Sequence, residues 1–185
     1  MTLKMSFEDF TRPLEIKKLV KEEKKTCNFP TKAYAVDKAI PGNGKTLKGQ
    51  YGMHNAHACD YILINDGNVL LLEDSNLRKK KKELEKKYSK KISVRIIGKE
   101  QLLKAYASLL LLCRICSLDR TTRRLIRGKT VEFCVVCNDV KRKDSRVLSR
   151  IRGRLKQPLE NLVSDVHVLP LSELKRLTKN YPEST

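Results

Sequence analysis

The stretch DYILINDGNVLLLE, residues 60–73, decides how this chain is expected to fold. Its two apolar runs, 61–64 and 69–72, flank the dipeptide Asp66-Gly67, which favours a tight type I′ turn between antiparallel strands. Both runs are apolar at consecutive positions, so both faces of this hairpin are expected to be buried. The stretch therefore predicts a β-hairpin inside a sheet that is covered on both sides.

A two-residue turn also sets which residues of the hairpin face each other. Ile64 then faces Val69, and Asp60 faces Glu73 at the far end. Opposed residues have Cβ atoms about 4.5–5.5 Å apart, and like charges at that spacing are destabilising unless something compensates. Hard divalent ions such as Mg²⁺ take carboxylate oxygens plus water, so the pair predicts a site for Mg²⁺ or Mn²⁺. The alternative is that both acids splay into solvent and pair with nearby lysines.

The rest of the chain predicts helices and strands around this hairpin. Helices are expected over residues 13–25, 77–91, 100–118, 145–156 and 172–179. Strands are expected over residues 92–97, 130–137 and 165–169, with strand fragments at 33–36 and 46–51. The expected fold class is α/β, with a mixed central sheet flanked by helices. We expect one domain over residues 1–185, with a core at about 10–140 and a C-terminal helix, strand and helix at 145–180.

The charge of the chain indicates what kind of partner it has. It has 40 Lys and Arg against 21 Asp and Glu, a formal net charge of +19, and only 5% aromatic residues. So few aromatic residues argue against a stacking platform for single strands, and 40% hydrophobic residues exclude full disorder. A polyanion is the natural partner of such a charge, although charge-rich surfaces also stabilise proteins from hot environments.

A stripe of arginines indicates what part of this positive charge binds. Arg146, Arg150 and Arg154 recur every fourth residue along the helix expected over 145–156. Arginine pairs bidentately with phosphate, so this helix face predicts binding to a nucleic-acid backbone without reading its bases. Lys45 and Lys48, just before the hairpin, are expected to contact the same backbone. DNA is favoured over RNA as the partner.

The hairpin and its surroundings resemble the PD-(D/E)XK restriction-endonuclease-like nucleases. The resemblance rests on Asp60, on the apolar strand that ends in LLLEDS at residues 70–75, and on the basic helix that follows. It implies a core of helix, three-stranded meander, helix and strand over about residues 10–140, in which Asp60 and Glu73 bind Mg²⁺ or Mn²⁺. The implied activity is hydrolysis of phosphodiester bonds by an intracellular endonuclease.

The chain departs from that family at one position. Where the family has a lysine two residues after the glutamate, this chain has Ser75. In the family that lysine helps to position or deprotonate the attacking water, and serine can bind water but supplies no positive charge. Either Lys79, Lys45 or Lys48 supplies the charge, or the site is inactive and the protein is a nucleic-acid-binding or interaction subunit.

Four cysteines raise a third possibility. Cys113-x-x-Cys116 and Cys134-x-x-Cys137 have the spacing of a four-thiolate Zn²⁺ site, which would make the protein a zinc-stabilised binding module. Residues three apart on a strand point to opposite faces, however, so the second pair could share one ion only if the chain turned there. The alternatives are small buried core cysteines or a disulfide.

The remaining expectations concern location and assembly. The N-terminus lacks the apolar stretch of a secretory signal, and the uninterrupted apolar run at 109–112 is far shorter than the ~20 residues needed to cross a bilayer. The sequence therefore predicts a cytoplasmic protein without a membrane partner. The helix expected over 100–118 is apolar almost all round, which indicates a buried or interface helix and, in the second case, a homodimer.

Overall fold

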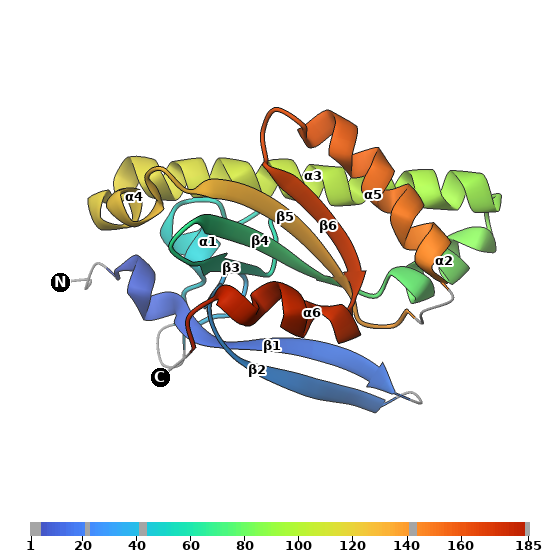
Figure 1. Ribbon diagram of the computed structural model, residues 1–185, viewed down its shortest axis with the longest axis horizontal. Helices are drawn as coiled ribbons and strands as arrows, with labels where there is room; N and C mark the ends of the chain where they lie inside the picture. The colour runs from blue at the N-terminus through green and yellow to red at the C-terminus, as the bar shows by residue number, and fades with distance from the viewer. Residues whose placement is uncertain (1–4, 21–22, 41–43, 141–143, 184–185) are drawn as a thin grey trace.

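The computed structural model describes residues 5–20, 23–40, 44–140 and 144–183, and in this part of the chain six strands form one sheet. Figure 1 shows the sheet with helices packed against it. The strands follow one another across the sheet in chain order: β1 (Thr11–Val20), β2 (Glu23–Ala35), β3 (Tyr61–Ile64), β4 (Asn68–Ser75), β5 (Thr130–Cys137) and β6 (Asp165–Pro170). Pairing is antiparallel from β1 to β4 and parallel from β4 to β6, which confirms the mixed α/β class.

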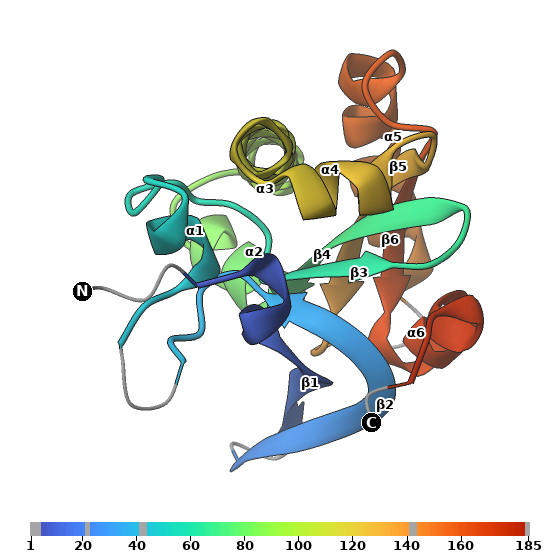
Figure 2. The same cartoon turned by 90° about the vertical axis from the view of Figure 1, so that its left-hand side faces the viewer.

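Helices cover both faces of this sheet. One face carries the long helix α3 and the helix α5, and the other carries α6, as the end-on view in Figure 2 shows. The helical segments are η1 (Phe7–Phe10), α1 (Leu47–Gln50), α2 (Leu77–Glu85), α3 (Lys90–Leu118), α4 (Arg120–Ile126), α5 (Ser145–Leu159), α6 (Leu171–Leu177) and η3 (Thr178–Asn180). The helices expected at residues 77–91, 100–118, 145–156 and 172–179 and the strands expected at 130–137 and 165–169 are therefore present, with shifted ends.

The hairpin β3–β4 has the predicted register but a different turn. Ile64 pairs with Val69 and Tyr61 with Leu72. The Asn65 side-chain oxygen accepts the amides of Gly67 at 2.9 Å and Asn68 at 2.6 Å. The described glycines with positive φ are Gly44, Gly52 and Gly128, so the predicted type I′ turn is wrong. The Asn65 side chain holds the turn closed, and Gly67 needs no left-handed backbone.

Residues 13–25 were expected to form a helix, and this prediction is wrong. Of these, residues 13–20 lie in β1 and residues 23–25 in β2, and Leu14 pairs with Phe29 and Ile16 with Cys27. Leu14 and Ile16 are two residues apart and both fully buried, which is the periodicity of a strand. The register shifts next to Pro13, whose ring nitrogen cannot donate to the ladder.

Two expected strands are helical. Residues 46–51 contain the short helix α1, whose N-cap Thr46 accepts the Gly49 amide at 3.1 Å. Residues 92–97 belong to the first turns of α3, where Ser93, Val94 and Ile97 are buried at helical spacing. A β-branched run therefore lies inside a helix here, because burial against the sheet outweighs its weak preference for strands.

Helix α3 has 29 residues and makes the crossover that the parallel strands β4 and β5 require. Its outer side exposes Leu103 by 57% and Leu110 by 63%, and the expected dimer through this helix stays a prediction. By length and composition alone α3 could cross a membrane, since its apolar residues continue past Gln101 and Lys104. A third of its most apolar stretch is buried inside the fold.

Alternation along β4 decides which side chains meet α3. Val69 and Leu71 belong to the core on the α3 side of the sheet, whereas Leu70 and Leu72 belong to the core on the α6 side. Glu73 and Ser75 continue the first series, because side chains alternate between faces along a strand. The polar end of β4 therefore lies beneath the middle of α3.

Candidate functional site

The two acids at the open end of the β3–β4 hairpin are brought together as predicted. Asp60 directly precedes β3, and its amide donates to the carbonyl of Leu72, the residue before Glu73, at 3.0 Å. The Asp60 carboxyl is oriented by the Asp74 amide, which donates to its Oδ2 at 2.8 Å. The Glu73 side chain is only 2% exposed. The buried Glu73 carboxyl and the backbone-held Asp60 carboxyl therefore lie close enough to interact.

A lysine from α3 completes this group. The Lys104 ammonium forms an ion pair with Glu73 Oε1. Two further residues on the same side of α3 bind the hairpin: the Gln101 amide donates to Ser75 Oγ at 3.4 Å, and Ser108 Oγ accepts the Cys59 amide at 2.7 Å. Spacings of three and four residues place these side chains on one helix face. Helix α3 thus holds three residues in place: Cys59, which precedes Asp60, and then Glu73 and Ser75.

Burial and charge shift the pKa values in this cluster. Burial, together with the negative charge of Asp60, raises the pKa of Glu73 to about 8, although Lys104 opposes the shift. Burial also raises the pKa of Asp60, against the Asp74 amide and the charge of Lys104. For Lys104, burial lowers the pKa, but the charges of Glu73 and Asp60 outweigh it and raise the pKa overall. Burial and Asp60 thus favour the protonated form of Glu73, whereas Lys104 favours the ionised form.

The donor set fits a hard divalent cation. Glu73 Oε2 is buried and has no hydrogen-bond partner among the described residues, and the Asp60 carboxyl lies beside it. Mg²⁺ commonly binds one or two carboxylates and keeps several waters. The described residues contain no group of three or more Asp, Glu, His or Cys that could hold a metal ion. A metal here would therefore be held by Asp60 and Glu73 and completed by water.

The lysines named from sequence do not contact Glu73. Lys79 is exposed on α2, and its backbone amide donates to Asp139 Oδ2 at 2.7 Å. Lys48 forms an ion pair with Asp37 Oδ1 at 2.9 Å, and the Lys45 carbonyl accepts the Ile40 amide at 2.9 Å. Ser75 is buried beside Gln101 rather than facing solvent. The positive charge that contacts Glu73 belongs to Lys104 on α3.

Sequence reasoning missed Lys104, although the chain carries a signal for it. Lys104 is the one charged residue between 101 and 113, a stretch otherwise made of apolar and small polar residues. A lysine in such a helix needs an acidic partner, because an unpaired buried charge is costly. The two acids of the hairpin were the natural candidates for that partner.

The arginine stripe lies on α5 as predicted, but away from the acidic pair. Arg146, Arg150 and Arg154 are exposed. A Cβ on Gly98 of α3 would lie 3.1 Å from Arg154 Cδ, so α5 packs on the Gly98 side of α3. Six residues separate Gly98 from Lys104, a rotation of about 240° around the helix. The arginines and Lys104 therefore lie on different flanks of α3.

The four cysteines do not form the predicted Zn²⁺ site. Cys134 belongs to the core on the α6 side of the sheet and Cys137 to the core on the α3 side, because the strand does not turn between them. Cys113 is exposed and Cys116 half-buried on α3, and all the cysteines are free. Burial raises the pKa values of the Cys134 and Cys137 thiols. These two are core thiols.

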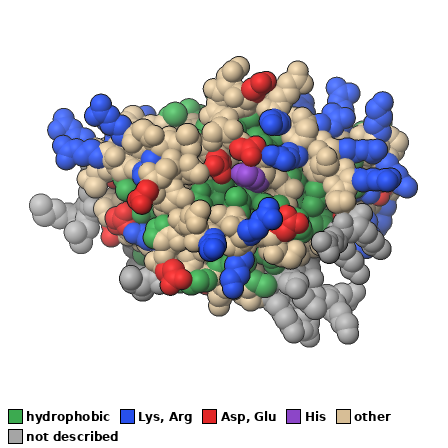
Figure 3. Space-filling view, viewed as in Figure 1, with side chains coloured by type: hydrophobic (Ala, Val, Ile, Leu, Met, Phe, Trp, Pro, Cys, Tyr) green, Lys and Arg blue, Asp and Glu red, His purple; other side chains and the backbone are tan. Residues whose placement is uncertain are grey.

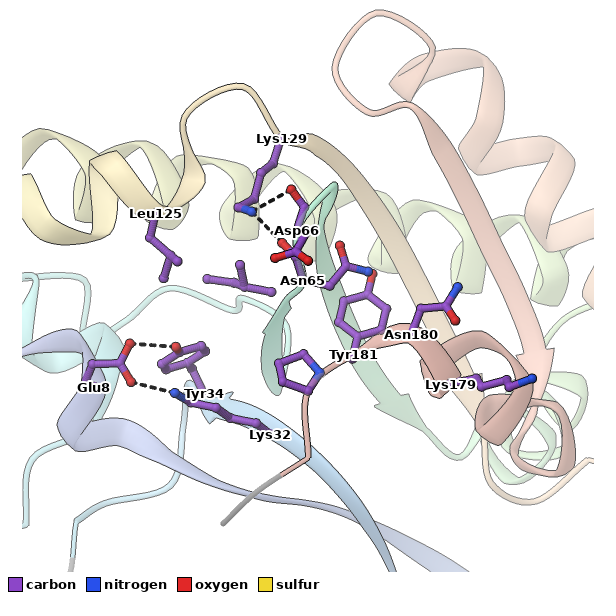
Figure 4. A pocket seen from close by; sticks show the side chains of 12 residues that line it. Glu8, Lys32, Tyr34, Asn65, Asp66, Leu125, Lys129, Lys179, Asn180 and Tyr181 are labelled. Carbon is purple, nitrogen blue, oxygen red and sulfur yellow. Dashed lines mark hydrogen bonds and ion pairs between the residues drawn. The ribbon is translucent and has the colours of Figure 1, made fainter.

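A separate cavity of about 450 Å³ lies between η1, the β3–β4 turn, α4 and the C-terminal segment (Figure 4). Some of its polar groups bind one another: Tyr34 and Lys32 donate to the two Glu8 oxygens at 2.8 and 2.9 Å. Lys129 likewise donates to the carbonyl oxygens of Asn65 and Asp66. Because Glu8, Lys32, Tyr34 and Lys129 are engaged in these bonds, we place the candidate site at the acidic pair instead.

No protein-family model, curated protein or solved structure matches this chain. The function of the site is therefore argued from the geometry and charge of its own residues.

Proposed function

We propose that the protein is a metal-dependent nuclease that hydrolyses phosphodiester bonds of nucleic acid, with DNA favoured, at Asp60, Glu73 and Lys104. One observation carries this proposal: the Lys104 ammonium contacts Glu73. It thereby provides, from α3, the positive charge that the PD-(D/E)XK pattern takes from the position occupied here by Ser75. Two acids and a lysine in one cluster are what hydrolysis of a phosphate ester needs from the protein.

Each residue has a definite part in the proposed reaction. Asp60 and Glu73 would hold Mg²⁺ or Mn²⁺, which supplies a Lewis acid and lowers the pKa of a bound water. The Asp74 amide keeps the Asp60 carboxyl oriented, at 2.8 Å. Lys104 holds Glu73 in place, and its remaining N–H groups can orient the attacking water or bind a phosphate oxygen. Gln101 and Ser108 keep α3 in register with the hairpin, at 3.4 and 2.7 Å from their partners.

The order of the elements supports the same proposal. The antiparallel strands β2, β3 and β4 are followed by α3 and by the parallel strand β5. This is the meander, helix and strand that the restriction-endonuclease-like core implies, with β1 standing where its first helix was expected. The exposed arginines of α5 and the net charge of +19 supply the attraction for a nucleic acid.

The second candidate is a nucleic-acid-binding protein of the same fold without hydrolysis. The burial of Glu73, which is 2% exposed, favours this candidate, because a metal and a phosphate must both reach that carboxyl. The two candidates differ in one measurable property, which is metal-dependent cleavage.

Cleavage assays separate them. The full chain is incubated with plasmid, single-stranded DNA and RNA in Mg²⁺, Mn²⁺ or EDTA, beside Asp60→Asn, Glu73→Gln and Lys104→Met. Glu100→Gln is the control, since Glu100 also lies on α3 and pairs with a lysine, Lys80, at 2.5 Å. We expect metal-dependent cleavage by the wild type and the control only. Equal cleavage by all variants rejects the site, and no cleavage with any metal favours the binding protein.

A further inference from the structure

A groove of about 570 Å³ runs between the first turns of α3 and the second half of α5. Two helices far apart in the sequence supply its walls, and Figure 1 shows them crossing at one end of the molecule. The lining consists of cationic and small or apolar side chains: Lys90, Lys91, Val94, Arg150, Gly153 and Arg154. The lining therefore carries four positive charges and no acid.

These four cations are without acidic partners in the part of the chain that the structure describes. None of them has a hydrogen bond or an ion pair through its side chain there. Neighbouring cations do find partners: Arg152 of α5 binds Asp165 at 3.1 Å, and Lys80 binds Glu100 at 2.5 Å. The four charges of the groove are therefore not neutralised by acids among the described residues.

The backbone holds these charges close together. Gly98 has no side chain, so the stem of Arg154 packs directly on α3, with Cδ 3.1 Å from the position of a Cβ. Arg150 and Arg154 are one turn apart, with Cβ atoms about 5–6 Å from each other. The N-terminal end of a long helix adds a partial positive charge of its own beside Lys90 and Lys91. Figure 3 shows Lys and Arg side chains gathered on this side of the molecule, over α2 and α5.

We propose that this groove binds the sugar-phosphate backbone of a nucleic acid, at a site distinct from Asp60 and Glu73. The inference deepens the proposed function and rests on it for the identity of the polyanion. Arginine and lysine bind phosphate oxygens, and no lining residue other than these cations offers a side-chain donor or acceptor for a base edge, so binding is independent of sequence. Lys91 lies about 20 Å from Lys104 along α3, which corresponds to about six base pairs of duplex.

A nucleic acid fits the groove better than an anionic membrane does. Lipid-binding helices place protruding apolar side chains beside their cations. The apolar residue that lines this groove, Val94, is only 6% exposed and lies at its floor, while the 46% exposed Ile92 lies outside the lining. A flat bilayer could not reach that floor, whereas a single phosphodiester strand can enter a groove between two helices.

The test measures binding in EDTA, so that it does not depend on cleavage. A fluorescent duplex of about 20 base pairs is titrated at several salt concentrations with the full chain and two double variants, Arg150→Gln with Arg154→Gln and Lys90→Gln with Lys91→Gln. Because each double variant removes two phosphate contacts, the slope of log K against log salt becomes less steep by about 1.8 in both. Affinity at low salt falls about tenfold or more in both.

The matched control removes two arginines at the other end of the molecule. Arg124→Gln with Arg127→Gln changes exposed residues on and just after α4, with the same loss of charge. We expect the slope of log K against log salt to change in this control by less than half as much as in the two groove variants. Equal effects in all three double variants, or no effect in the two groove variants, overturn the proposal.

Two further arms identify the ligand. Vesicles of phosphatidylserine and phosphatidylcholine replace the duplex in one arm, and inorganic phosphate competes with it in the other. Loss of vesicle binding in the groove variants with unchanged DNA binding overturns the proposal. If the wild type never cleaves but the groove variants bind DNA more weakly than the control, the groove stands and the nuclease does not.

Discussion

The Lys104 ammonium on α3 contacts the Glu73 carboxyl on β4, so a helix supplies the positive charge beside the paired acids. In Lys104→Met this charge is lost while the stem keeps its length. We expect metal-dependent cleavage to fall about 10²-fold or more, and the free energy of unfolding to fall by about 1–3 kcal/mol. Cleavage rates and urea unfolding measure the two effects. Lys99→Met, at an exposed position of the same helix, is the control and should change neither.

Metal affinity is expected to depend on pH. The pKa of Glu73 is raised to about 8 by burial and by Asp60. Below that pH a bound proton must leave before the carboxylate can hold a cation, so Mg²⁺ affinity rises about tenfold per pH unit until it levels off near pH 8. Calorimetry in two buffers of different ionisation enthalpy reports the released proton. An affinity that is constant across this range, or proton release that persists in Glu73→Gln, would contradict the assignment.

The same carboxyl links stability to pH when metal is absent. Its pKa is higher in the folded protein, about 8 against 4.5, so folding favours the protonated form. The resulting stabilisation is complete below about pH 4.5 and is lost as the pH rises through 8. We expect the melting temperature of the wild type to fall over this window relative to that of Glu73→Gln, in EDTA. If the melting temperatures of the two proteins depend on pH in the same way, Glu73 does not cause this dependence.

Ser108 is expected to matter for the position of Asp60. Its hydroxyl accepts the buried Cys59 amide at 2.7 Å and donates to the Lys104 carbonyl at 2.7 Å. Ser108→Ala leaves that amide unsatisfied, which costs about 1–3 kcal/mol of unfolding free energy. Ser117→Ala removes a hydroxyl from an exposed position of α3 and should cost less than about 0.5 kcal/mol. Equal costs would mean that the Cys59 bond contributes nothing.

Two helical glycines provide a test of the α3–α5 contact. A Cβ added at Gly153 would meet nothing within 4 Å, so Gly153→Ala should stabilise the protein by about 0.5–1 kcal/mol through helix propensity. At Gly98 the added Cβ would lie 3.1 Å from Arg154 Cδ. Gly98→Ala should therefore lose this gain or destabilise. Thermal unfolding of the two variants compares them, and equal gains would show that α5 does not pack closely on α3.

The hairpin was predictable because its information is local. Turn length and two apolar runs set the register, which ends at Tyr61 and Leu72, the chain neighbours of Asp60 and Glu73. Lys104 was not predictable in this way, since its contact with Glu73 depends on how a 29-residue helix lies across the sheet. The type of turn was also missed, because Asn65 provides a side-chain bond that the dipeptide rule ignores.

For β1 the local pattern was ambiguous, and the helix predicted from it was wrong. Ile16 is four residues before Val20, a spacing that fits a helix, while Leu14 and Ile16 fit a strand equally well. Pairing with β2 decides between them. The strand β2 could not itself be predicted, because its residues are rich in lysine and proline. Short apolar patterns of this kind leave the choice to tertiary contacts.

The parallel pairing of β4 with β5 has a consequence for the order of folding. Asn68 pairs with Thr130 across the whole α3 crossover, whereas β3 and β4 are joined by a short turn. A hairpin closes in about 1–10 μs, and contacts across long loops form later. Asp60 and Glu73 thus meet early and repel each other until Lys104 arrives with α3. A chain whose crossover has not docked therefore carries an acidic hairpin end with no charge to balance it.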